Sequence, residues 1–467
     1  MNVLAWANQE FGEASLSDVR LQRRLVATAA RIRLNPCGTL TRTITNVSEL
    51  KGAYRLFANP KVRYWDIMEH HFDKTRQACR ASGAYLMIED TTELSFSQRE
   101  KISGLGPLTK EGSQGFLAHT CLSMRIEGWS TDEKPDLTVV GLFGQECWAR
   151  KPVEGSRAER KKVKRQQKAS GNYKSESDRW GRSILSVASP EAGTQWTLVA
   201  DRESDIFSLM TRCKEHKVDF ILRAAQARKV LPDGEKVFQY MEKAPVLGRF
   251  VLPLRSRPGV KARKAMLELR AVSTLIQPPL ENPLNLKVLP VNLVEVREIN
   301  PPKGAEPVHW LLLTSWPCDS FSQVQRVVQT YASRWLIEEY HKALKTGTNI
   351  EDSQLSTFER INALLAVHAI VAVNLLAMKL LARTRPNELV TEKVISPEAL
   401  QVLNLMCGRP REGWTNDHFC RTIARMGGYL NRKSDGPPGW LSIWRGWLKL
   451  MVMLEGFRLA KEEGTCG

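Results

Sequence analysis

Two short apolar runs, each followed by acidic residues, constrain the fold of this chain most strongly. Residues 85–88 (YLMI) precede Asp90 by two positions, and residues 196–200 (WTLVA) directly precede Asp201. Runs of this length and composition are typical of buried strands in an α/β sheet. Functional groups in open α/β sheets gather past the carboxyl ends of strands, so both aspartates are candidate functional residues. For either aspartate alone, a helix cap or a turn residue is the simpler interpretation.

Residues 331–347 form the second constraining stretch. They contain no Pro, are rich in helix formers and end in a Gly, which predicts one helix. At about 100° per residue, one side of this helix carries Tyr331, Arg334, Glu338 and Lys345. The opposite side is apolar and carries Leu336, Ile337, Tyr340, Ala343 and Leu344. A solvated polar stripe on an amphipathic helix would explain such a row by itself.

The charge balance points to a polyanionic partner. Lys and Arg number 68 against 50 Asp and Glu, a formal net charge of +18. A soluble chain this basic is expected to meet nucleic acid or an anionic membrane surface. The excess is spread over several segments, including residues 157–168 and 255–264, which favours an extended basic surface over a localisation signal. Contact of residues 157–168 with the DNA backbone and a merely solvated charge run both remain open.

Cysteine spacing and hydropathy indicate a reducing compartment. The nine cysteines include no Cys-x-x-Cys pair, which argues against a disulfide framework or a structural zinc site. No secretory segment is recognisable at the start of the chain. Residues 361–381 are long and apolar enough to span a membrane, but they are interrupted by Asn362, His368, Asn374 and Lys379. We therefore predict a buried core helix there, a cytoplasmic protein and no membrane partner.

Short basic helices are expected in the N-terminal part. Residues 16–32 predict an amphipathic helix capped by Asp18, and residues 48–57 predict another that carries Lys51 and Arg55. Small helices with Arg on one face suit DNA grooves and phosphates. A basic surface without a specific role is an equally good interpretation of these helices alone.

Three later segments complete the expected layout. Residues 224–307 contain alternating strand patterns, at 265–272 and 291–297 among others, and predict an inserted β subdomain. Residues 310–314 predict a further buried strand. The terminal stretch 440–459 places Trp440, Trp444 and Trp447 on one helical stripe. Such a stripe can cap the core or form a dimer contact, and we favour the dimer contact.

Three carboxylates are available for metal chemistry if the fold brings Asp90, Asp201 and Glu338 together. Such a set suits hard divalent cations, with Mg²⁺ the usual choice and Mn²⁺ an expected substitute. Two ions about 4 Å apart would support an in-line phosphoryl transfer. The basic side chains beside Glu338 would hold the flanking phosphates. A glycosidase also uses two carboxylates, but it needs neither these cations nor a net charge of +18.

The spacing of Tyr331, Arg334, Glu338 and Lys345, with the sequence DRE at 201–203 upstream, resembles the signature of the insertion-sequence-four family of bacterial cut-and-paste transposases. The resemblance extends in order along nearly the whole chain. Its main blocks are residues 52–57, 88–92, 140–142, 201–206, 298–304, 310–315, 334–339 and 424–428. The chain departs from the pattern at residues 116–117, and its segment 157–168 is more basic than the resemblance would suggest. The DNA sequence recognised is therefore left open.

This resemblance implies an α/β protein with a ribonuclease-H-like catalytic core, an inserted β subdomain and flanking helical domains. The expected boundaries are residues 1–65 for an N-terminal DNA-end-binding domain, 66–380 for the catalytic domain with 224–307 inserted, and 381–467 for a C-terminal dimerisation domain. The implied partners are double-stranded DNA, both transposon ends and target, and a second copy of the chain in a synaptic dimer.

The resemblance also implies a role for each matching position. Asp90, Asp201 and Glu338 would be the metal-binding catalytic triad. Tyr331, Arg334 and Lys345 would grip phosphates near the transposon end. Trp310 would stack on a base flipped out of the duplex, with Trp335 filling the space it leaves. Arg223 would lie near the active site, and Arg24 and Arg55 would belong to the end-binding surface.

The implied reaction is metal-dependent hydrolysis at the transposon end. The freed 3′-hydroxyl then attacks the opposite strand to form a hairpin, which is hydrolysed before strand transfer into target DNA. Two alternatives remain: a non-catalytic DNA-binding inhibitor of transposition, and a metal-dependent nuclease without strand transfer. The presence of all three acids disfavours the first alternative, and the pair Trp310 and Trp335 disfavours the second.

Overall fold

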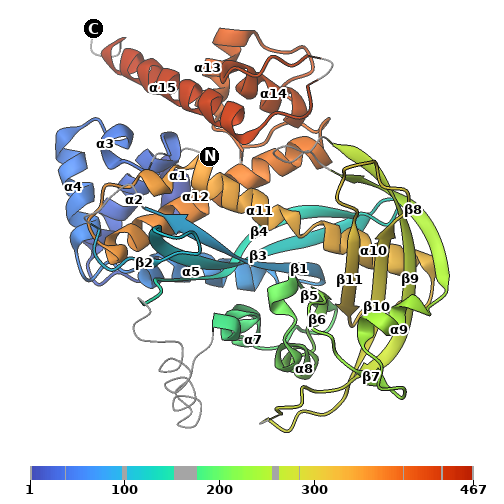
Figure 1. Cartoon of the computed structure of the whole chain (residues 1–467). Coiled ribbons are helices and arrows are strands. Elements are labelled where there is room, and N and C mark those ends of the chain that lie inside the picture. The colour runs from blue at the N-terminus through green and yellow to red at the C-terminus, as the bar shows by residue number, and fades with distance from the viewer. Residues whose placement is uncertain are drawn as a thin grey trace.

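The computed structural model describes residues 3–36, 38–96, 102–151, 176–254, 262–282, 284–392, 394–432 and 435–464. The basic segment 157–168 lies outside these ranges, as do residues 255–261 of the second basic segment. One large mixed sheet runs through the centre of the molecule (Figure 1). Its strand order is β2-β3-β1-β5-β6-β11-β10-β9-β7, with β4 paired to β3 and β8 paired to β9.

The strands have the following bounds: β1 Gly83–Ser95, β2 Gly106–Pro107, β3 Gln114–Trp129, β4 Pro135–Trp148, β5 Thr194–Ala200, β6 Asp219–Arg223, β7 Val230–Leu231, β8 Val246–Leu254, β9 Arg263–Ile276, β10 Leu289–Glu298 and β11 His309–Thr314. The strands predicted at residues 265–272, 291–297 and 310–314 are confirmed within β9, β10 and β11. The strands of the inserted segment join the central sheet through β11, so the insertion extends the sheet.

The helices have the following bounds: α1 Val3–Phe11, α2 Val19–Leu34, α3 Leu40–Thr43, α4 Val47–Ala58, α5 Tyr64–Ala78, α7 Arg182–Leu185, α8 Phe207–Glu215, α9 Val237–Glu242, α10 Phe321–Ala332, α11 Trp335–Lys342, α12 Phe358–Thr384, α13 Pro397–Cys407, α14 Asn416–Met426 and α15 Trp440–Gly464. Short 3₁₀ turns cover η1 Glu176–Arg179, η2 Arg202–Ser204 and η4 Ile350–Asp352, and η3 Ala343–Gly347 is a π-helix. The two predicted N-terminal helices are confirmed as α2, which Asp18 caps, and α4.

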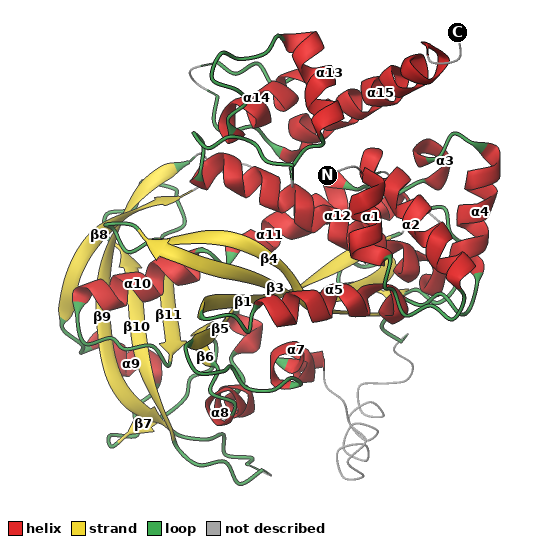
Figure 2. Ribbon diagram, turned by 180° about the vertical axis from the view of Figure 1, so that it is seen from behind, coloured by secondary structure: helices red, strands yellow, loops and turns green. Residues whose placement is uncertain are grey.

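The sheet separates two buried cores. One core contains residues of α5, α10, α11 and α12, and the other contains residues of α8 and α9. Figure 2 shows α5 and α10 on the near face of the sheet. Side chains alternate along β1 between the cores, because successive residues of a strand point to opposite faces. Leu86 and Ile88 enter the first core, whereas Tyr85 and Met87 enter the second.

The prediction that Asp90 follows the end of its strand is wrong, because Asp90 lies inside β1. The parallel pairing of β1 with β5 ends at Ile88 opposite Val199. β1 continues to Ser95 as an antiparallel partner of β3. Asp90 therefore lies past the end of the parallel pairing, where one edge of β1 no longer has β5 beside it.

The long apolar helix α12 is a buried core helix, as predicted. By length and composition it could cross a membrane, but 83% of its most apolar 18-residue stretch is buried inside the molecule. It runs between the sheet and the C-terminal helices α13, α14 and α15 (Figure 1). Lys379, which interrupts the apolar run, is only 5% exposed.

The tryptophan stripe of α15 does not form the dimer contact that we favoured. Trp440, Trp444 and Trp447 are 7%, 3% and 6% exposed, and they belong to the chain's own core. They are buried because α14 packs closely against α15: a Cβ on Gly446 would stand 1.7 Å from the backbone oxygen of Ile423. The stripe therefore caps the core, which was the other interpretation of this pattern.

Residues 331–347 do not form one continuous helix, contrary to the prediction. α10 ends at Ala332, and a tight turn through Ser333 and Arg334 precedes α11. In this turn the amide of Arg334 donates to the carbonyl of Tyr331, three residues back, at 2.9 Å. The apolar side is nevertheless where the pattern places it, since its five residues are all at most 2% exposed.

Candidate active site

Asp90 and Asp201 lie on neighbouring parallel strands. The register pairs Ile88 with Val199, so its continuation by two residues sets Asp90 beside Asp201. Asp201 directly follows β5 and caps the turn η2, where its Oδ1 accepts a hydrogen bond from the Arg202 amide at 2.6 Å. Asp90 has the same strand parity as Ile88, whose side chain enters the core that α11 covers. Both carboxylates are thereby brought to the α11 side of the sheet.

Arg334 joins Asp90 to Glu338. Its Nη1 donates to Oδ2 of Asp90 at 3.2 Å, and its Nη2 contacts Oε1 of Glu338 one turn further along the chain. The Arg334 side chain is 15% exposed, whereas that of Glu338 is 47% exposed. One guanidinium therefore lies between a strand carboxylate and a helix carboxylate, at a place that solvent reaches.

The charges at this site act on one another. Burial raises the pKa of Asp90, Arg334 lowers it, and the negative charges of Asp201 and Glu338 raise it again, with a net upward shift. Burial acts to lower the pKa of Arg334, but Tyr331 and the three acids outweigh it and raise that pKa. Asp90, Asp201 and Glu338 thus lie close enough together for their fields to overlap at Arg334.

Tyr331 is a buried member of this cluster, so the alternative of a solvated polar stripe does not hold for this residue. It is 4% exposed, and its ring lies 5.1 Å from that of Trp310, edge to face. Burial and the charge of Asp201 raise its pKa, while Arg334 and Arg223 lower it in part. Arg223 also donates to the His309 carbonyl at 3.1 Å. The tight turn after α10 separates Tyr331 from the exposed side of α11.

The remaining predicted residues flank this cluster. Trp335 is the first residue of α11, and the guanidinium carbon of Arg383 lies 5.5 Å from its ring centroid. Lys345 lies on the π-helix η3 and is half-buried. Burial and the charge of Lys345 lower the pKa of His341 to about 3, which keeps that imidazole neutral.

The donor chemistry fits a hard divalent cation, although the geometry is not closed around one. Among the described residues, no three or more His, Cys, Asp or Glu side chains converge closely enough to hold a single ion. Asp90 and Glu338 instead share Arg334. Three carboxylates are the ligand type that Mg²⁺ and Mn²⁺ prefer. Closure on an ion would require Arg334 to leave at least one of them.

Arg24 and Arg55 lie away from the carboxylates, on the N-terminal helices α2 and α4 (Figure 1). Both side chains are exposed. Arg24 lies against Gly52 of α4, where an added Cβ would stand 3.3 Å from its Nε. Gly52 is one helical turn from Arg55, so the two arginines occupy adjoining helix faces.

Three protein-family models match the chain. Residues 4–62 match the transposase DNA-binding model, residues 183–375 match the transposase DDE domain, and residues 370–467 match the transposase Tn5 dimerisation domain. The three matches follow one another along the chain in the order that the sequence resemblance predicts. The chain belongs to the Tn5-type DDE transposases. It is therefore a DNA-binding, dimer-forming enzyme with a ribonuclease-H-like core and a dependence on divalent metal.

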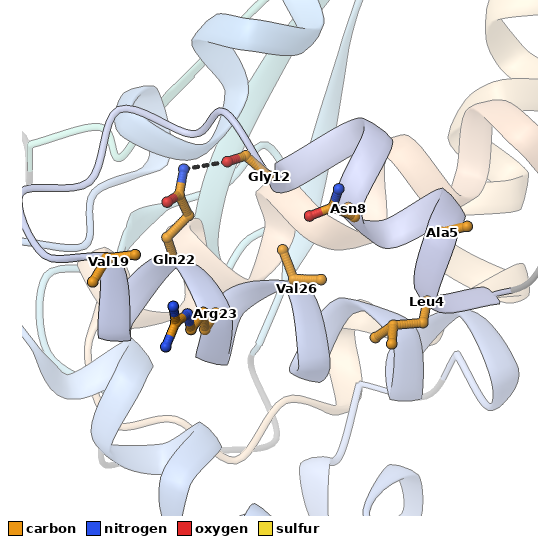
Figure 3. Close-up of a pocket in the computed structure, with 8 residues that line it drawn as sticks. All are labelled: Leu4, Ala5, Asn8, Gly12, Val19, Gln22, Arg23 and Val26. Atoms are coloured by element: carbon orange, nitrogen blue, oxygen red, sulfur yellow. Dashed lines mark hydrogen bonds between the residues drawn. The ribbon is translucent and has the colours of Figure 1, made fainter.

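The DNA-binding segment of the transposase also contains an open pocket of about 590 Å³ between α1 and α2. Figure 3 shows Asn8, Gln22 and Arg23 among its lining residues, with Gln22 donating to the Gly12 carbonyl. None of its lining residues belongs to the carboxylate cluster. The pocket is a feature of the N-terminal helices.

Sequence reasoning missed a buried hydrogen-bond network next to the carboxylate cluster. The side-chain amide of Gln145 on β4 donates to Thr120 at 2.7 Å and to the Tyr340 hydroxyl at 3.0 Å. Its amide oxygen accepts from the Tyr64 hydroxyl at 2.8 Å. Thr120 is the strand partner of Asp90. The network ties α5, β3, β4 and α11 together, and the sequence carries no local signal for it.

Asp205 was missed as well. Its Oδ2 accepts from the amides of Ala225 and Gln226, both at 2.7 Å, and its Oδ1 pairs with Arg228. These contacts hold the turn after Asp201 against the loop that follows β6. Arg223 is the last residue of β6. The available signal was the position of Asp205 within the conspicuous block 201–206, where we gave a role to Asp201 alone.

Proposed function

We propose that this transposase excises its DNA element through a hairpin intermediate and joins the freed 3′ ends to target DNA, with Asp90, Asp201 and Glu338 as its metal ligands. The observation that carries the proposal is the simultaneous contact of Arg334 with Asp90 and Glu338 beside Asp201. An acidic site neutralised by an internal cation is suited to exchange that cation for divalent metal. We take Mg²⁺ to be the physiological ion.

The bound metal would activate the attacking oxygen and stabilise the departing one. Arg334, released from the carboxylates, would hold phosphate oxygens next to the scissile bond through its planar fork of donors. Lys345 would neutralise a neighbouring phosphate. The buried hydroxyl of Tyr331, whose raised pKa keeps it protonated, would donate to the DNA backbone.

The hairpin step requires a base to leave the duplex, because the backbone must turn sharply at the transposon end. Flipping costs a few kcal/mol, and stacking on an indole offsets about 1–3 kcal/mol of it. Trp310 is backed by Tyr331, and Trp335 stands at the start of α11. We assign Trp310 to the flipped base and Trp335 to the space that the base leaves.

A homodimer would complete the reaction, with each active site acting on the DNA end bound mainly by the other subunit. α15 supports this arrangement because a second side of the helix, about 100° round the axis from its tryptophan stripe, carries large apolar residues that are exposed. Leu441, Val452 and Leu459 share that side and are 50%, 63% and 59% exposed. We propose this exposed face as the contact between subunits, and Arg24 and Arg55 as part of the surface that binds the transposon end.

The test uses the purified chain with the inverted repeats that flank its own gene. We expect the wild type with Mg²⁺ to nick the end and form a hairpin, visible on a denaturing gel. We expect Asp201→Ala to lose cleavage while it still shifts the end DNA on a native gel. Cleavage that survives in Asp201→Ala would overturn the metal-ligand assignment. If the wild type cleaved without forming a hairpin, the protein would be a nuclease without strand transfer. If the wild type bound the end without cleaving it, the protein would be a non-catalytic inhibitor.

A further inference from the structure

Glu339, the neighbour of Glu338, is turned away from the carboxylate cluster into a buried contact. Its Oε2 accepts one hydrogen bond from Nζ of Lys379 at 2.6 Å and another from the indole nitrogen of Trp440 at 2.8 Å. The Glu339 side chain is 12% exposed and that of Lys379 is 7% exposed. A single carboxylate oxygen therefore joins three helices that are distant in sequence: α11, α12 and α15.

Lys379 also contacts Trp440, so that Glu339, Lys379 and Trp440 each touch the other two. Nζ of Lys379 lies 4.1 Å from the ring centroid of Trp440, within the range of a cation–π interaction. Burial lowers the pKa of Lys379 to about 8, which shows how strongly its charge is desolvated. Removal of any member leaves a buried group without its partner, so the contact is suited to hold one arrangement and to resist others.

A second contact holds the same side of α11. Arg383, one turn after Lys379 on α12, lies over Trp335, which is one turn before Glu339 on α11. α12 therefore grips α11 at two points on one side, while Glu338 and Arg334 form the active site on another. Trp440 is the first residue of α15, and the close crossing of α14 and α15 at Gly446 fixes where that helix starts.

We propose that Glu339, Lys379 and Trp440 are positioning residues through which the seated C-terminal domain sets the orientation of α11, and with it the carboxylate of Glu338. This inference rests on the proposed role of Glu338 as a metal ligand. In this arrangement the dimerisation domain contributes to metal binding within its own subunit, because α11 takes its working orientation only with Trp440 docked on Glu339.

The test compares two conservative changes on the same helix of the full-length protein. Trp440→Phe keeps an aromatic ring beside Lys379 but removes the N–H that Glu339 accepts. Trp447→Phe is the matched control: Trp447 is equally buried and packs near Phe419, with a ring separation of 6.5 Å, outside the junction. Mn²⁺ affinity, measured by electron paramagnetic resonance without DNA turnover, is the main readout, and melting temperature reports structural damage.

We expect Trp440→Phe to weaken Mn²⁺ binding about tenfold, the range typical of lost outer-shell support for a metal ligand. Trp447→Phe should leave Mn²⁺ affinity unchanged even where it lowers the melting temperature as much. Lys379→Met should weaken Mn²⁺ binding too, and its effect should not add to that of Trp440→Phe, because the two residues act on one carboxylate. Loss of affinity in proportion to melting temperature in all three variants would overturn the inference.

Failure of this inference is distinguishable from failure of the proposed function. If Asp201→Ala abolishes cleavage and Trp440→Phe binds Mn²⁺ as the wild type does, only the junction is wrong. If Asp201→Ala still cleaves, the metal-ligand assignment is wrong, and the junction loses its basis with it.

Discussion

Two adjacent carboxylates of α11 differ in almost every physical respect. Glu338 is 47% exposed and pairs with Arg334, one turn away on the same segment. Glu339 is 12% exposed and accepts from Lys379 and Trp440, which belong to two other helices. Because Glu338 is half-exposed, water can solvate its carboxylate when it leaves Arg334, so this separation costs less than that of a fully buried pair. A buried pair cannot separate without leaving an unpaired charge in a poorly solvating place.

This difference teaches how one short helix can serve both chemistry and architecture. The exposed side keeps charges that can change partners, as the proposed metal site would require if it also holds DNA phosphates. The closed side keeps charges that cannot change partners, which fixes the helix. Three substitutions test whether solvent-accessible polar groups affect mainly activity and buried polar groups affect mainly stability.

The largest effect is expected at the open site, on activity and not on stability. Asp90→Asn should lower the rate of end cleavage by about 1,000-fold or more, the scale seen when a group that stabilises transition-state charge is removed. The melting temperature of the metal-free protein should not fall, because the change removes one negative charge from a cluster that already raises the pKa of Asp90. If Asp90→Asn lowered the melting temperature as well as the cleavage rate, Asp90 would be needed for stability, and this prediction would be wrong.

The next effect is expected at the buried hydrogen-bond network around Gln145, where it should appear as a loss of stability. Gln145→Leu removes the amide that Tyr64, Thr120 and Tyr340 share, and should reduce the free energy of unfolding by about 3 kcal/mol. Tyr64→Phe is the control, since it removes one hydrogen bond of the same network and should cost about 1 kcal/mol. Urea titration followed by tryptophan fluorescence measures both. Equal losses in the two variants would contradict a cooperative network.

The smallest effect concerns Glu10, which joins α1 to α5 through His71 at 3.0 Å and Lys74 at 2.9 Å. Burial raises the pKa of Glu10, but these partners outweigh it and lower the value from 4.5 to about 2. A lowered carboxyl pKa gives stability that is full above the unfolded value and is lost as pH falls through the folded value. The wild type should therefore lose about 2 kcal/mol from this residue between pH 5 and pH 3.

Glu10→Gln should already lack that contribution at pH 7 and should show a correspondingly weaker acid dependence of its melting temperature. Asp417→Asn is the matched control, because Asp417 forms a half-exposed pair with Arg421 one turn away on α14. It should change stability by less than about 0.5 kcal/mol at either pH. If the melting temperature falls with pH to the same extent in the wild type and in Glu10→Gln, the contacts of Glu10 do not stabilise the fold in the way proposed.

The sequence predicted those features that follow from local pattern. The apolar runs before Asp90 and Asp201, the capped helix α2 and the buried side of α11 all follow from composition and periodicity. Periodicity shows which side of an element is buried but not which element covers it, and that is why the tryptophan stripe of α15 was assigned to a partner subunit. The contacts of Gln145, Asp205 and Glu339 depend on long-range packing, so no local pattern could show them.

The long helix α12 limits where two such transposases can be joined to make a chimaera. The match to the DDE domain ends at residue 375 and the match to the dimerisation domain begins at residue 370, so both fall within the single helix Phe358–Thr384. No linker separates the two modules at that point. A chimaera that exchanges the C-terminal module must therefore inherit the entire helix from one parent, together with the residues of α11 that recognise it.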